Sequence, residues 1–185
     1  ANDTDKAINY LAKFANLMRF ILSHSQKPFV NLSDELKATE IYLDVERLRF
    51  DNKFNYAIEI DPVIDEEFLE IPPMILQPYI ENAILHGLLN KEGVGKLNIQ
   101  LMMMDKEYLK CVIEDNGIGR EKAAEIRQRT GLHHKSKGMM ITQKRLEILN
   151  KTNKDQVNVK IVDLKDENNQ ACGTRVELII IYKEV

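Results

Sequence analysis

The sequence predicts an α+β fold: a mixed β-sheet covered by helices on one face, preceded by a two-helix segment. Apolar residues recur at helical spacing through the first 50 of the 185 residues. Beyond Asp51, runs that alternate between apolar and polar residues indicate strands, and further helical stretches lie between them. We therefore divide the chain into a helical segment at residues 1–50 and an α+β domain at residues 51–185.

The first fifty residues contain two helical patterns. Pro28 interrupts the first pattern, because proline cannot continue a helix. Ser33 is the predicted N-cap of the second helix, with Asp34 and Glu35 in its first turn. The two helices are expected to pair as a hairpin whose apolar faces need a partner. The first apolar face consists of Ile8, Leu11, Ala12, Ala15, Met18, Ile21 and Leu22.

The remainder predicts strands and helices in a mixed order. "FNYAIEID" alternates like a strand and ends before Pro62. "IPPMILQPYIENAILHGLLN" has prolines at 72 and 73 that suit the start of a helix, and Pro78 is tolerated near its first turns. "KLNIQLMMMD" and "YLKCVIED" are two strands, "MMITQKRLEILNK" is a helix, and "QVNVKIVDL" and "TRVELIIIY" are a final pair of strands.

Composition excludes some functional classes. The net charge is −3 and the charges are interspersed, so there is no basic stripe for nucleic acid and we expect no nucleic-acid partner. No apolar run reaches the length of a membrane span. Two cysteines without metal spacing are typical of a reducing compartment. We expect a cytoplasmic chain.

Three polar clusters interrupt these elements, and each has an ordinary structural interpretation. Glu81, Asn82 and His86 lie at helical spacing in "QPYIENAILHG", and they could form a solvated stripe on a helix. An amide oxygen is also a suitable ligand for Mg²⁺. In "CVIEDNGIGR", two glycines follow a strand, either as a simple turn or to let another group approach the backbone. Gly138 opens the last helix, as a cap or as part of an anion site.

The order and spacing of these clusters carry more information than any one of them. A helix with Asn82 and His86, a strand ending in "DNGIG", a helix opened by glycine and a final "GTRVELIII" resemble the ATP-binding domain of the GHKL superfamily, the Bergerat α/β sandwich. "LMRFIL", "ELKATEIYLDVERLRF", "IPPMILQPYIENAILHG" and "SKGMMITQKRLEILN" are similar to the LytS-type sensor histidine kinases of bacterial two-component systems. The resemblance covers essentially the whole chain.

The resemblance implies residues at the phosphate end of an ATP site. Asn82 corresponds to the asparagine that ligates the Mg²⁺ ion bridging the phosphates, and Glu81 lies beside it in the same catalytic box. His86 corresponds to a polar residue near the phosphates. Lys137 is a candidate phosphate-binding cation, and Gly138 corresponds to the glycine beneath a lid that covers the phosphates.

The resemblance also implies residues at the adenine end. Asp115 corresponds to the aspartate that accepts a hydrogen bond from the adenine amino group. Gly117 and Gly119 correspond to glycines that let base and backbone come close. Gly173 and Thr174 match the last motif, near the base. An ionised carboxylate only accepts hydrogen bonds, so Asp115 favours an amino group over a carbonyl and adenine over guanine.

Two positions depart from the family pattern. Leu85 stands where a lysine often precedes the histidine, so Lys135 or Lys137 is left to supply a cation. Ser136 stands where the second glycine motif commonly has its first glycine. We interpret residues 126–137 as a lid that is mobile without nucleotide, because it is polar and has little to bury. Its candidate contacts are Arg127, Arg129, His133 and His134.

The resemblance implies a homodimeric kinase that transfers the ATP γ-phosphoryl group to a histidine and then to a response regulator. Two alternatives stay open: a non-catalytic nucleotide-binding module, and a GHKL ATPase. In the family, the acceptor histidine lies in an Asn-Pro-His-Phe-type motif, which is absent from these residues. His24 in "ILSHSQ" is the rival acceptor. We therefore expect an acceptor upstream, and no self-phosphorylation by this chain alone.

Overall fold

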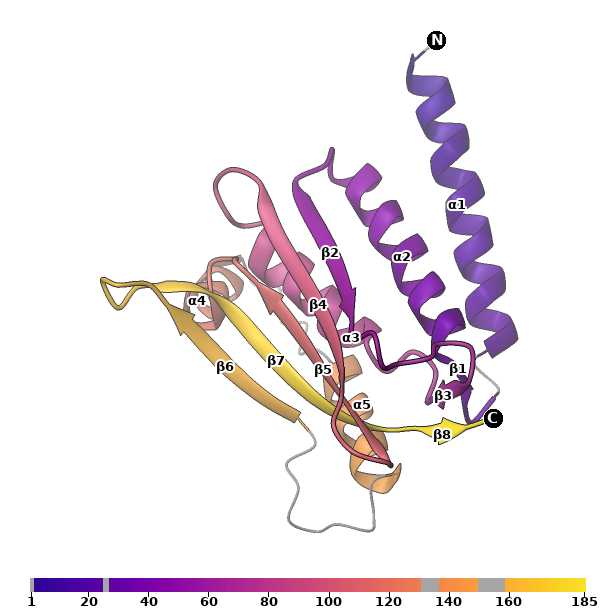
Figure 1. Cartoon of the computed structure of the whole chain (residues 1–185). Coiled ribbons are helices and arrows are strands. Elements are labelled where there is room, and N and C mark those ends of the chain that lie inside the picture. Colours follow the sequence, from indigo (N-terminus) through magenta and orange to yellow (C-terminus); the bar gives the residue numbers. More distant parts are fainter. Residues whose placement is uncertain (1, 25–26, 131–136, 150–158) are drawn as a thin grey trace.

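A five-stranded sheet forms one layer of the domain, and three helices with a π-helix cover one of its faces (Figure 1). The computed structural model describes residues 2–24, 27–130, 137–149 and 159–185. In spatial order, the strands are β2 (Phe54–Ile60), β4 (Gly95–Met103), β5 (Tyr108–Asp115), β7 (Ala171–Ile181) and β6 (Val159–Lys165). The covering elements are α3 (Gln77–Asn82), the π-helix η1 (Ala83–Leu88), α4 (Arg120–Thr130) and α5 (Lys137–Leu149).

The sheet is mixed. β2 pairs with β4 in parallel, and every other neighbouring pair in this sheet is antiparallel. A parallel pair needs a long crossover connection, and α3 and η1 lie within that connection. The observed sheet therefore confirms the predicted α+β class, with helices on one face.

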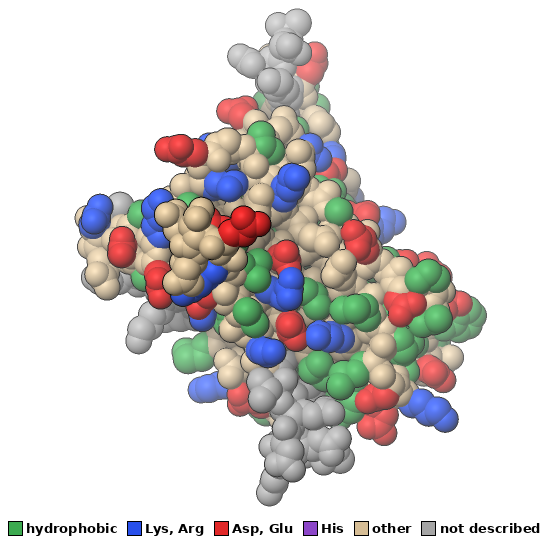
Figure 2. Space-filling model, turned by 60° about the vertical axis from the view of Figure 1, so that its left-hand side comes forward, with side chains coloured by type: hydrophobic (Ala, Val, Ile, Leu, Met, Phe, Trp, Pro, Cys, Tyr) green, Lys and Arg blue, Asp and Glu red, His purple; other side chains and the backbone are tan. Residues whose placement is uncertain are grey.

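Alternation along the strands fixes which face is buried. In β4, Leu97, Ile99 and Leu101 are almost fully buried beneath the helices. The opposite face carries ion pairs between neighbouring strands: Lys110 with Glu177 at 2.8 Å and Arg175 with Glu114 at 2.6 Å. On the face seen in Figure 2, acidic and basic side chains are interspersed rather than separated by sign.

Two helices pack beside the sheet, as predicted for the first fifty residues. α1 (Asn2–His24) lies along α2 (Leu32–Arg49), and its N-terminal end projects beyond α2 (Figure 1). α2 buries Leu32, Leu36 and Leu43 in the main core. Among the described residues, no helix is both long enough and apolar enough to cross a membrane.

A small second sheet was not predicted. Its strands are β1 (Val30–Asn31), β3 (Leu69–Ile71) and β8 (Lys183–Glu184), in the order β1-β3-β8. Strands of two or three residues are too short to show an alternating pattern. β1 lies before the domain boundary that we place near residue 51, and it pairs with β3, which lies after it. The boundary therefore stays a prediction.

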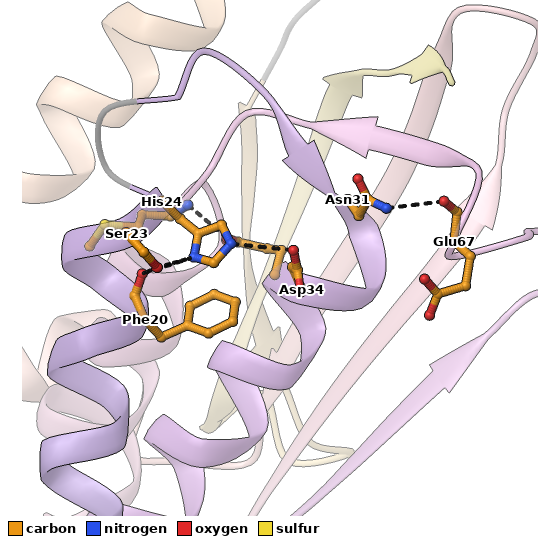
Figure 3. A network of polar contacts seen from close by, with 8 residues as sticks. Phe20, Ser23, His24, Asn31, Asp34 and Glu67 are labelled. Carbon is orange, nitrogen blue, oxygen red and sulfur yellow. Dashed lines mark hydrogen bonds and ion pairs between the residues drawn. The ribbon is translucent and has the colours of Figure 1, made fainter.

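Two predicted helix starts are wrong. Asn31, not Ser33, is the N-cap of α2. Its side chain makes no capping hydrogen bond, and its Nδ2 donates to Glu67 O at 3.1 Å (Figure 3). The helix expected from Pro72 and Pro73 begins at Gln77, with Pro78 in its first turn. The residues between β3 and α3 form turns, in which Met74 has a left-handed backbone with φ of 58°.

Candidate functional site

The first predicted cluster lines a cleft between the α3–η1 segment and the start of α5. The cleft has a volume of about 160 Å³. Its lining residues are Pro78, Glu81, Asn82, Leu85, His86, Gly138 and Met139. The structure therefore brings Gly138 to Asn82 and His86, although 52 residues separate His86 and Gly138 in the sequence.

The backbone changes its helical form inside this cluster. Asn82 is the last residue of α3, and His86 lies in η1, where Leu89 N donates to Ile84 O at 3.0 Å. π-Helical turns are uncommon and occur often at functional sites. The wider turn keeps Asn82 and His86 on the cleft and turns Gly87, the next residue, toward the sheet.

Glu81 is held on the side of the cleft nearest α2. Gln77 Nε2 donates to Glu81 Oε1 at 3.2 Å. Burial raises the pKa of Glu81, and the carboxylate of Glu46 in α2 adds to this effect, while the hydrogen bond from Gln77 opposes it. A carboxyl group with a raised pKa is better suited to accept and hold a proton near neutral pH.

Asp115 ends β5 as a buried carboxylate. Its side chain is only 4% exposed, and Oδ1 accepts a hydrogen bond from Gly117 N at 2.8 Å. Burial raises the pKa of Asp115 to about 6, against the effect of backbone hydrogen bonds from Gly117 and Thr174. Thr174 lies opposite Asp115 in the pairing of β5 with β7. The structure thus brings the predicted adenine-end residues Asp115, Gly117 and Thr174 together.

Glycines allow three segments of the chain to meet around Asp115. A Cβ atom on Gly117 would lie 2.4 Å from the carbonyl carbon of Gly87. A Cβ atom on Gly87 would lie 2.7 Å from Asp115 Oδ1, and one on Gly173 would lie 1.9 Å from Asp115 O. Gly119 has a positive φ of 77°, which favours glycine. No larger side chain fits at these contacts.

Gly87 is a site residue that the sequence analysis missed. It joins the two halves of the site, since it follows His86 and touches the Asp115–Gly117 turn, and its carbonyl accepts a hydrogen bond from Ile118 N. A glycine inside a helix costs about 1 kcal/mol relative to alanine. That cost within "ILHGLL" was the signal that another part of the chain approaches there.

Half of the proposed lid lies outside the described residues. Positions 131–136, which include His133, His134, Lys135 and Ser136, are not described. Residues 126–130 were interpreted as part of the lid, but they form the last turns of α4. Lys137 is the first residue of α5.

His24 is engaged in a local network (Figure 3). Its Nδ1 lies 2.9 Å from Phe20 O and 2.8 Å from Ser23 Oγ, and its ring stacks on Phe20 with 4.0 Å between centroids. Its Nε2 lies 3.3 Å from Asp34 Oδ2 on α2. Both ring nitrogens therefore have partners: Nδ1 binds within α1, and Nε2 ties the end of α1 to the start of α2.

Two glycine substitutions test the packing of the site. We expect Gly117→Ala to lower the free energy of unfolding by about 1–3 kcal/mol, because the backbone of Gly87 must move to admit the new methyl group. The matched variant Gly138→Ala should not lower it, since its Cβ would meet Pro78 Cβ at an ordinary 3.5 Å and alanine is favoured over glycine in a helix. Urea unfolding measures both. Equal losses would show that the Gly87–Gly117 contact is not specially tight.

Comparison with known proteins supports a histidine kinase relationship. A family model described as "Histidine kinase" matches residues 1–54. The sensor protein LytS of Oceanobacillus iheyensis is 30% identical over 98% of this chain and 30% of its own length. The chain spans less than half of the length of the curated relatives that it matches first.

Solved structures share the fold at low sequence identity. The histidine kinase domain from the Erythrobacter litoralis blue-light activated kinase superposes with a TM-score of 0.54 at 12% identity, over 96% of this chain and 81% of that one. The catalytic domain of the histidine kinase ThkA gives a TM-score of 0.51 at 16% identity, over 83% and 93%. The sequence match to LytS runs through both the helical hairpin and the α+β domain, so the chain is homologous to part of the LytS-type sensor histidine kinases.

Proposed function

We propose that this chain is the ATP-binding catalytic part of a two-component sensor histidine kinase. It would transfer the γ-phosphoryl group of ATP to a histidine outside these 185 residues, and from there to a response regulator. One observation carries the proposal: the buried carboxylate of Asp115 meets Gly87 and Gly117 beside a cleft that is lined by Asn82, His86 and Gly138.

The Asp115 end suits an adenine base. Its carboxylate is buried, so a hydrogen bond to a ligand is made in a poorly solvated place, where it discriminates strongly. The carboxylate can only accept, which suits the adenine amino group and disfavours a guanine carbonyl. The glycines at 87, 117 and 173 let the backbone pack closely around Asp115, which fixes the position of its carboxylate.

The cleft suits the phosphates and Mg²⁺. The Asn82 side chain offers an amide oxygen, and Mg²⁺ favours oxygen ligands from one or two side chains together with substrate phosphates and water. When bound, Mg²⁺ neutralises charge on the phosphates. Gly138 lies in the first turn of α5, where backbone N–H groups without helical partners attract anions. The residues present therefore fit a metal–nucleotide complex.

α1 suits a dimer interface. Ile8, Leu11 and Met18 are 60%, 62% and 40% exposed, and with Ala15 they follow the alternating spacing of three and four residues of a coiled-coil seam. We propose that a second copy of the kinase covers this stripe. We also place the domain in the cytoplasm, where ATP is available, with any membrane attachment supplied by other parts of the kinase.

One observation favours a non-catalytic module instead. Leu85 is 40% exposed on the cleft and puts an apolar side chain where the family often has a lysine. This removes one cation for the phosphates. Titration with Mg-ATP separates the two readings: binding at micromolar to low millimolar concentrations supports the kinase, and no binding at millimolar concentration supports the module.

The first prediction concerns Asp115. We expect Asp115→Asn to weaken ATP binding by roughly 10–100-fold, the value of one hydrogen bond to a buried charged group. Glu114→Gln, its neighbour on the opposite face of β5, should stay within about twofold. Because the pKa of Asp115 is about 6, the carboxylate is ionised at pH 7.5 and mostly protonated at pH 5.

ATP affinity should therefore fall as pH falls through 6, by roughly tenfold at pH 5, and this dependence should disappear in Asp115→Asn. Calorimetry on both proteins across this pH range is the measurement, and comparing them removes the titration of ATP itself. The same pH profile in wild type and Asp115→Asn would remove Asp115 from the base pocket.

The second prediction concerns Asn82. We expect Asn82→Ala to weaken binding of Mg-ATP by roughly tenfold and to leave binding of metal-free ATP within about twofold, because the amide oxygen acts through the metal. Titrations with Mg²⁺ and with EDTA measure the two affinities. Equal weakening under both conditions would show that Asn82 supports the helix and is not a ligand.

The third prediction concerns the acceptor. These residues lack an Asn-Pro-His-Phe-type motif, and both ring nitrogens of His24 have partners in Figure 3. The purified chain should bind Mg-ATP but incorporate no acid-labile phosphate from γ-labelled ATP. A kinase segment that carries the motif, added in trans or fused upstream, should restore labelling. Labelling of the chain alone that disappears in His24→Gln would place the acceptor at His24.

A further inference from the structure

The turn that connects β3 to α3 is held by charged side chains from two other helices. Glu35 of α2 accepts hydrogen bonds from Met74 N at 2.8 Å and from Ile75 N at 3.1 Å. Arg145 of α5 donates from Nη1 to Pro73 O at 2.7 Å. Glu35 and Arg145, which we call the turn clamp, thus bind consecutive backbone groups.

This turn has a strained backbone that needs such support. Met74 has φ of 58°, a left-handed conformation that side-chain-bearing residues disfavour. Glu35 is only 4% exposed, and burial raises the pKa of its carboxyl group against the effect of the backbone hydrogen bonds and of Arg145. Burying a carboxyl group is costly unless it is fully hydrogen-bonded, so Glu35 specifies one conformation of the turn.

The turn leads directly into the residues of the cleft. Leu76 O accepts hydrogen bonds from Tyr79 N and Ile80 N, so the first turn of α3 is built on it. Asn82 closes this six-residue helix. Because α3 is a single short helix, a displacement at its start moves Asn82 by nearly the same distance.

The clamp also reaches the opposite wall of the cleft. Arg145 lies two turns along α5 from Gly138, which faces Asn82 across the cleft. By binding Pro73 O, Arg145 ties α5 to the turn before α3. The same backbone turn therefore contacts the elements that form both walls of the cleft.

We propose that Glu35 and Arg145 are positioning residues of the nucleotide site, and that Glu35 makes the placement of Asn82 depend on the position of α2. The inference rests on the proposed function, because it assigns these residues an effect on Mg-ATP binding.

Tight packing allows the hairpin to act through this contact. The space between α1, α2 and the turn is lined by Leu17, Thr39, Tyr42 and Met74 among others, and it holds about 20 Å³, room for one water molecule. This small free volume leaves little room for α2 to shift without moving the turn. By linkage, nucleotide that favours one position of the turn also favours one position of α2.

Variants of the clamp test the inference by calorimetry with Mg-ATP. Glu35→Gln keeps the shape of the side chain, but its amide nitrogen cannot accept the second backbone hydrogen bond. Arg145→Gln removes the donor to Pro73 O. We expect each to weaken binding roughly tenfold. The double variant should be weakened less than the product of the two, since both act on one turn. Exposed controls on the same helices, Glu40→Gln on α2 and Lys144→Gln on α5, should stay within about twofold.

Hydrogen exchange without nucleotide gives a second readout. We expect Glu35→Gln to increase exchange in residues 74–88 and to leave β4 and β5 unchanged. If the wild-type protein does not bind Mg-ATP, the proposed function is wrong. The exchange pattern still tests whether Glu35 holds the turn and the residues that follow it. Wild-type affinity in a folded Glu35→Gln protein, or a uniform rise in exchange that includes β4 and β5, would overturn the proposal. If Glu35→Gln does not fold, the half-buried Arg145 position carries the same test.

Discussion

The contact between Gly87 and the turn at Asp115–Gly117 is the constraint on which the site depends. It brings the helical layer against the end of the central strand β5, at distances that exclude even one methyl group. The π-helix places Gly87 there, and the same segment keeps Asn82 and His86 on the cleft. The proposed base-recognition end and the proposed phosphate end are thus fixed relative to one another by backbone contact, which varies less than contact between long side chains.

The helical hairpin shares its core with the elements that carry the proposed nucleotide site. α2 buries Leu32, Leu36 and Leu43 in the core that it shares with the sheet. Glu35, in the first turn of α2, binds the backbone of the segment before α3. On its other side, α2 carries Asp34, which meets His24, and Asp44, which pairs with Lys13 of α1. α2 therefore lies between the helix that presents an apolar stripe and the helix that presents Asn82, which suits transmission of a signal.

Much of this arrangement was predictable, because its causes are local or repeat along the chain. Alternation in β4 and β5 and helical periodicity in α1 and α2 indicated these elements. The motifs at Asn82, Asp115 and Gly138 indicated candidate site residues through a resemblance, since periodicity alone does not bring segments far apart in the chain together. The small β1-β3-β8 sheet was missed, because strands this short exist only through long-range pairing.

The errors at helix starts have a common physical origin, and it explains why the clamp was invisible in the sequence. Ser33 and Pro72 are favourable residues for a helix start, and tertiary contacts overrode both preferences. Asn31 is drawn into β1, and the chain after Pro72 is held in a turn by Glu35, 39 residues before Met74. In the sequence, Glu35 is an ordinary acid in the first turn of a helix. Its burial, the left-handed Met74 and the distant Arg145 give it a second role, and that role exists only in the folded chain.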